Sequence, residues 1–116
     1  MSAHRMAADA TLSSAVNVLA DPGDWVSSNY IEEPTGLTSV CIVTTTGSET
    51  RRLPVATNLT PGQAVSITGQ ANTLEVEDSG GSSVCTLSAG EVGICVVGAS
   101  GSTYEWQGVV VKSSAN

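Results

Sequence analysis

The stretch from residue 52 to residue 106 decides the fold of this chain. From Arg52 to Val97 it reads RLPVATNLTPGQAVSITGQANTLEVEDSGGSSVCTLSAGEVGICVV, and it closes with GSTYEW at 101–106. Runs rich in β-branched residues alternate with turn residues. A new run begins about every ten residues, which is the spacing of a meander, a sandwich or a barrel. The stretch contains no catalytic motif, and taken alone it predicts an all-β domain.

Turns that contain glycine separate the expected strands. The alternation of polar and apolar residues places pairs such as Val65 and Ile67 on an inward face. The runs at 94–97 and 108–111 are instead apolar on both sides. They predict strands that are covered on both faces, so we expect subunit contacts there. The expected strands span 37–46, 50–53, 64–68, 73–77, 83–87, 92–97 and 103–112.

A chain of 116 residues is expected to form one domain. We divide it into an N-terminal arm with local anchoring, residues 1–36, and a domain at residues 37–116. The domain is predicted to be a small antiparallel β-sandwich or a jelly-roll-like fold. The arm contains the turn sequence DPGD at 21–24, together with Trp25 and Tyr30. Arms of this kind commonly become ordered against a partner subunit.

The chain is acidic, with a formal net charge of −7 from 11 acidic and 4 basic residues. Nucleic-acid binding needs clustered lysine and arginine, and the basic pair Arg51-Arg52 is too small for that. An acidic surface permits docking on a basic protein surface. No apolar run approaches the ~20 residues of a membrane span, and residues 1–20 lack the apolar region of a signal peptide. We therefore expect no nucleic acid and no membrane as partner, and synthesis without secretion.

The predicted core is built without phenylalanine, from valine, leucine, isoleucine, alanine and cysteine. Aromatic side chains bury the most area each, so this core is thin and we expect oligomer contacts to add stability. Cys41, Cys85 and Cys95 lie in apolar runs and form no CxxC pair. They predict buried free thiols, while one disulfide with one thiol left over stays open.

The densest acidic cluster comprises Glu75, Glu77 and Asp78. Two carboxylates on one strand face could bind a cation or act as an acid–base pair. Metal loops need more oxygen ligands, however, and glycosidases need a cleft, so a solvated strand face is the favoured interpretation. The glycines at 80–81 lack the lysine and the following helix of a phosphate loop and indicate a hairpin turn. Because no nucleophile with a base, metal-ligand set or cofactor box is present, we expect no enzyme and no cofactor.

Tyr104 and Trp106 alternate on one face of the last expected strand. They could form an aromatic platform for a sugar. Placement in the core or in an interface, where both residue types are enriched, is the favoured interpretation.

The pattern of turn glycines and apolar residues resembles a β-domain found in virion proteins of tailed bacteriophages. Its parts are LPxAxxLxxGxxVxI at 53–67, LxVxDSGG at 74–81, VxxLxxGE at 84–91 and the terminal Trp106. It covers residues 50–108, about half of the chain. Thr68-Gly69 stands where the family often has an asparagine. The resemblance implies a structural virion protein with a jelly-roll-like or sandwich domain. Such a domain occurs in head decoration (cement) proteins and in tail or fibre proteins.

The small size of the chain favours the cement protein, because a fibre would need a shaft or an attachment domain. The resemblance then implies a homotrimer bound to the major capsid protein on the capsid exterior, made in the bacterial host cytoplasm. A tail or fibre module that binds a receptor or glycan is the alternative, and a carbohydrate-binding module of a bacterial enzyme is a third. The residues expected at the capsid or subunit interface are Trp25, Tyr30, Ile94, Val96, Tyr104, Trp106 and Val110.

Overall fold

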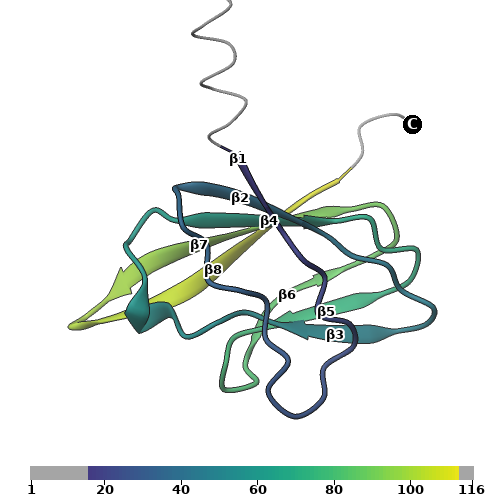
Figure 1. Cartoon of the computed structure of the whole chain (residues 1–116), viewed down its shortest axis with the longest axis horizontal. Coiled ribbons are helices and arrows are strands. Elements are labelled where there is room, and N and C mark those ends of the chain that lie inside the picture. Colours follow the sequence, from purple (N-terminus) through teal and green to yellow (C-terminus); the bar gives the residue numbers. More distant parts are fainter. Residues whose placement is uncertain (1–15, 113–116) are drawn as a thin grey trace, which may run out of the picture.

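The computed structural model describes residues 16–112 (Figure 1). Residues 1–15, which are the first part of the predicted arm, and residues 113–116 lie outside this description. The described chain is all-β apart from one short 3-10 helix. The elements are β1 (Val16–Leu19), β2 (Thr38–Ile42), β3 (Glu49–Arg52), η1 (Ala56–Asn58), β4 (Ala64–Thr68), β5 (Leu74–Glu77), β6 (Ser83–Leu87), β7 (Val92–Ser100) and β8 (Thr103–Val111).

The strands form two packed sheets, which Figure 1 shows as an upper and a lower layer. Sheet A has five strands in the order β1-β2-β4-β7-β8, and sheet B has three in the order β3-β5-β6. The prediction of an all-β protein is confirmed. Two packed sheets agree with the predicted sandwich, but its predicted antiparallel pairing is wrong for three strand pairs, because β1 with β2, β2 with β4 and β3 with β5 pair in parallel. The pairs β4–β7, β5–β6 and β7–β8 are antiparallel.

Crossings between the layers explain the parallel pairs. Parallel neighbours cannot be joined by a tight hairpin and need a crossover connection. Here the chain leaves β2 in sheet A, forms β3 in sheet B, and returns to sheet A as β4. It then crosses again, so that β5 lies beside β3. The β2–β4 and β3–β5 crossovers thus each pass through the other sheet, and the β1–β2 connection runs along the edge of sheet B.

The core lies between the two sheets and is made of small aliphatic side chains and thiols. Val65 and Ile67 are fully buried, which confirms their predicted inward direction. Leu74 and Val76 face them from sheet B and are also fully buried. Trp106 is the large aromatic side chain of this core. All three cysteines are buried and free, which confirms the prediction of unpaired thiols.

Residues 16–36 of the predicted arm lie against the two sheets. The segment contributes β1 to the edge of sheet A and then descends to the edge of sheet B, beside β3 (Figure 1). There the Trp25 amide donates to the Thr50 carbonyl oxygen at 2.9 Å, and the Ile31 amide donates to that of Arg52 at 2.9 Å. The Ile31 side chain is buried in the core. The division of the chain at residue 36 stays a prediction about sequence organisation, while this segment packs as part of the sandwich.

Candidate interaction surface

The outward face of sheet A is apolar across the whole width of the sheet. We call this surface the A face. The strand register places Val40 beside Val18 and Ile94 beside Val109, and side chains at paired positions point to the same side. The apolar residues of the A face are Val16, Val18, Val40, Ile42, Ala64, Val92, Ile94, Val96, Val109 and Val111.

Several of these side chains are strongly exposed. Val18 is 72% exposed, Ile42 59% and Val109 58%. The remaining outward positions within the described strands of sheet A are glycine, serine, threonine or glutamine, except for Glu105 near the tip of the β7–β8 hairpin. Single exposed apolar residues are ordinary on a protein surface, but a contiguous patch marks a site of interaction.

The outward face of sheet B is polar and charged. Glu75 and Glu77 share this face, as predicted, and lie beside Thr50 and Arg52 of β3. The Arg52 guanidinium pairs with the Glu77 carboxylate at 2.9 Å and lies 4.2 Å from the centre of the Trp25 ring. The two outer surfaces of the sandwich therefore differ in chemistry. Solvation suffices for the face of sheet B, whereas the A face leaves aliphatic side chains in water.

The seven predicted interface residues do not form one site. Ile94 and Val96 lie on the A face and are partly exposed, so within the described chain β7 is fully covered only on its inner side. Val110 points inward and packs against the core, because its partner Gly93 is an inward position. Trp25 and Tyr30 lie beside sheet B, with ring centres 4.9 Å apart.

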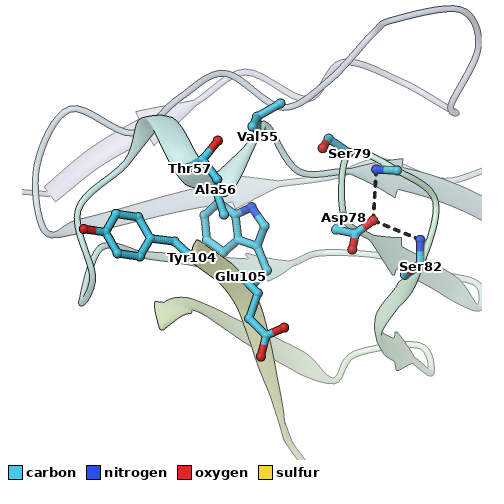
Figure 2. Close-up of a pocket in the computed structure, with 10 residues that line it drawn as sticks. Val55, Ala56, Thr57, Asp78, Ser79, Ser82, Tyr104 and Glu105 are labelled. Carbon is cyan, nitrogen blue, oxygen red and sulfur yellow. Dashed lines mark hydrogen bonds between the residues drawn. The ribbon is translucent and has the colours of Figure 1, made fainter. Parts of the chain in front are cut away.

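Tyr104 and Trp106 line a pocket of about 250 Å³ beside the β5–β6 turn (Figure 2). Trp106 is buried, and its indole Nε1 donates to the Pro54 carbonyl oxygen at 2.7 Å. The Tyr104 ring remains exposed at the pocket. Across the pocket, one carboxylate oxygen of Asp78 accepts from the Gly80 and Ser82 amides at 2.9 Å each, which closes the predicted hairpin turn. The pocket thus combines one accessible aromatic ring with hydroxyl and carboxylate groups.

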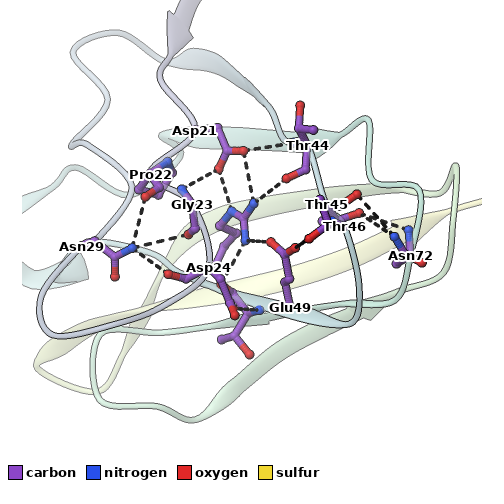
Figure 3. Close-up of polar contacts among 12 residues, drawn as sticks. Asp21, Pro22, Gly23, Asp24, Asn29, Thr44, Thr45, Thr46, Glu49 and Asn72 are labelled. Carbon is purple, nitrogen blue, oxygen red and sulfur yellow. Dashed lines mark hydrogen bonds and ion pairs between the residues drawn. The ribbon is translucent and has the colours of Figure 1, made fainter.

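A buried arginine, Arg51, fastens Asp21 to the sandwich, and Figure 3 shows the polar contacts around Asp21, Thr44 and Glu49. The Arg51 guanidinium donates to both carboxylate oxygens of Asp21, at 2.6 and 3.1 Å, and to Glu49 at 2.9 Å. It also donates to the Thr44 carbonyl oxygen at 3.0 Å. Burial alone would raise the pKa of Asp21, but the hydrogen bonds from Arg51 and from the Thr44 and Gly23 amides hold that pKa below its usual value. This cluster is structural, because its charges are paired inside the fold.

The A face contains residues that the sequence prediction did not include. Ile94 and Val96 were inferred from a continuous apolar run, but β1 and β2 were not recognised as parts of the same surface. The available signal was the alternation of Val16 with Val18 and of Val40 with Ile42. Alternation shows that two residues share a face, yet it does not show whether that face turns toward the core.

Comparisons with known proteins assign no family to this chain. No protein-family model, no curated protein and no solved structure matches it. Within residues 16–112, no helix is long and apolar enough to cross a membrane. In the same residues, histidine, cysteine, aspartate and glutamate form no group of three that could hold a metal ion.

Proposed function

We propose that this chain is a structural virion protein of a tailed bacteriophage, a capsid decoration or cement protein. It binds the major capsid protein on the capsid exterior as a homotrimer and stabilises the junctions between capsomers. It is made in the bacterial host cytoplasm and has no enzymatic role. The finer features, a jelly-roll-like relationship and an extended N-terminal arm that grips a neighbour, belong to this proposal as well.

The observation that carries the proposal is the contrast between the two outer faces of one small sandwich. One face is apolar and nearly free of ionisable groups, and the other is charged and solvated. Such an asymmetric module has little interior space for chemistry but two distinct surfaces for assembly. Its acidic character, with a net charge of −7, suits docking on a basic protein surface.

Symmetry supplies the stabilising mechanism. A closed oligomer presents the same docking surface several times. Contacts with several capsid subunits at once add up by avidity, so no single contact needs to be strong. A cement protein of this kind resists the outward push of packaged DNA by bridging neighbouring subunits. The sequence resemblance described above points to the same role.

Reconstitution on capsids that lack this protein tests the proposal. Capsids with the protein bound should withstand heating or a chelator better than bare capsids. Glu75→Lys on the charged face and Val109→Lys on the A face compare the two surfaces, and Val26→Lys, at an exposed valine of neither face, is the control. If bare and decorated capsids lose integrity at the same temperature, the cement role is wrong.

The pocket supports a second candidate, a glycan-binding module of a phage tail or fibre. Exposed aromatic rings beside hydroxyl and carboxylate groups are typical of sugar sites, and Tyr104 supplies such a ring. Trp106 is already bonded inside the fold, so Tyr104→Ala is the informative variant. Val26→Ala is its control, because Val26 is an exposed apolar residue that does not line the pocket. Glycan-array binding that Tyr104→Ala abolishes and Val26→Ala preserves would favour this function, whereas equal effects would contradict it.

A further inference from the structure

The extent of the A face is the first argument for a specific occupant. Its five strands are spaced about 4.8 Å apart and share a length of roughly 16 Å, which gives a projected area of about 400 Å². The largest apolar patches on soluble monomers reach about 300–600 Å² and are often functional. Side chains that protrude from a sheet add to the projected area. The A face is therefore large enough for an interface of a weak or moderate kind.

Charge is the second argument. The whole chain carries a net charge of −7, so two copies repel one another over most possible contacts. Among the outward positions of the described strands of sheet A, Glu105 is the ionisable residue, and it lies near the tip of the β7–β8 hairpin. Association through the A face thus keeps most acidic groups apart. A basic partner protein would bind the acidic surfaces elsewhere on the chain more favourably than it would bind the A face.

The third argument is that the described residues form no second apolar surface that could pack against the A face. Among residues 16–112, the large exposed apolar side chains away from the A face come from several separate segments. They do not form a second sheet-wide surface that could pack into the A face of a neighbour. The residues concerned are Val26, Tyr30, Leu37, Val55 and Tyr104. The best complement to an A face within this chain is therefore the A face of another copy.

We propose that copies of this chain associate through their A faces, which turn toward a shared symmetry axis and exclude water between them. Two faces can pack across a two-fold axis, and three can enclose a three-fold axis. The three-fold arrangement deepens the homotrimer of the proposed function, and only the number of copies rests on that function. Ile42, Ile94 and Val109 lie in this contact, while the charged face of sheet B stays free for a basic partner.

The oligomeric state of the full chain in solution tests the proposal. Light scattering after gel filtration, and sedimentation velocity, should give a mass of a multiple of 11.7 kDa. The modest area predicts dissociation on dilution through roughly the micromolar range. Val109→Lys should shift the protein to monomer, because a buried unpaired charge is costly. Val26→Lys should leave the oligomer intact, since Val26 is 65% exposed and lies away from the A face.

Cross-linking gives a second measurement that does not depend on a disruptive variant. Ser66 lies in β4, the middle strand of sheet A, and points outward. A short bismaleimide should therefore join Ser66→Cys chains to each other but not Ser48→Cys chains, whose exposed position lies outside sheet A. The native cysteines are buried and should not react in the folded protein.

Several results would overturn the proposal. One is a monomer at every concentration, which would leave residues 1–15 or another protein as the occupant of the A face. Others are an oligomer that persists in Val109→Lys, and an oligomer that Ser66→Cys does not cross-link. Capsid binding is measured separately. A monomer that protects capsids overturns this inference and the homotrimer but leaves the cement role, and an oligomer that fails to protect them overturns the cement role alone.

Discussion

Replacing Arg51 by methionine should lower the free energy of unfolding by about 3 kcal/mol. The Arg51 side chain is completely buried, and its guanidinium donates to two carboxylates and to the carbonyl oxygens of Thr44 and Thr50. Breaking a buried ion pair by removing one partner costs about 3–5 kcal/mol, because the other charge loses its compensation. Asp21 and Glu49 keep 20% and 12% of their side-chain exposure. Water therefore reaches both carboxylates in part, which places the cost at the lower end.

The neighbouring arginine on the same strand is the matched control. Arg52 also pairs with one carboxylate, that of Glu77, but on the outward face of sheet B, where both side chains are partly exposed. A partly exposed pair contributes about 0–1 kcal/mol, so Arg52→Met should change stability little beyond the loss of its contact with Trp25.

Urea unfolding followed by tryptophan fluorescence measures both variants. A double-mutant cycle of Arg51→Met with Asp21→Asn should give a coupling energy of about 0.5–3 kcal/mol, because the Arg51 and Asp21 side chains are in contact. Equal losses for Arg51→Met and Arg52→Met would refute the reasoning. So would an Arg51→Met protein as stable as the wild type.

Three further predictions follow from other contacts. Hydrogen bonds hold the pKa of Asp21 in the folded protein below its value in the unfolded chain. They stabilise the fold at a pH above the unfolded-state pKa, and this contribution is lost as the pH falls through the folded-state pKa. Below about pH 4, the free energy of unfolding should therefore fall less steeply with decreasing pH in Arg51→Met than in the wild type. Gly108→Ala should cost about 1–3 kcal/mol in a thermal or urea melt, because a Cβ there would lie 2.6 Å from the Val84 carbonyl oxygen, whereas Gly98→Ala meets the flexible Gln107 side chain and should stay within about 0.5 kcal/mol. Burial raises the pKa of Cys41 to about 11, and the hydrogen bond with Cys85 together with burial raises the pKa of Cys95, whereas that hydrogen bond lowers the pKa of Cys85. All three thiols are buried, so a thiol reagent should label them only after unfolding, and rapid labelling of Cys41 or Cys95 in the native protein would contradict the buried placement.

The candidate surface could be predicted only in part. The continuous run at 94–97 predicted a strand covered on both faces; in the described chain Ile94 and Val96 are partly exposed on the A face, and their place in an interface stays a prediction. Val110 packs against the core, and a run of valines does not reveal which of them turns inward, so its expected place in an interface stays a prediction. Trp106 belongs to the core and Tyr104 to a pocket, although the two alternate on one strand face. Tyr104 lies nearer the tip of the β7–β8 hairpin, opposite Ala99, so two side chains of one strand face differ in burial.

The sequence alone determined the strands, the glycine turns, the inward direction of Val65 and Ile67, and the burial of the thiols. These features depend on periodicity and on the nature of neighbouring residues. Strand pairing depended on the tertiary structure, because each parallel neighbour is reached through a crossing to the other sheet. The burial of Arg51 also depended on it, since its partner Asp21 lies 30 residues earlier in the chain. The A face is the clearest case, because five strands distant in sequence become one surface only when the sheet has formed.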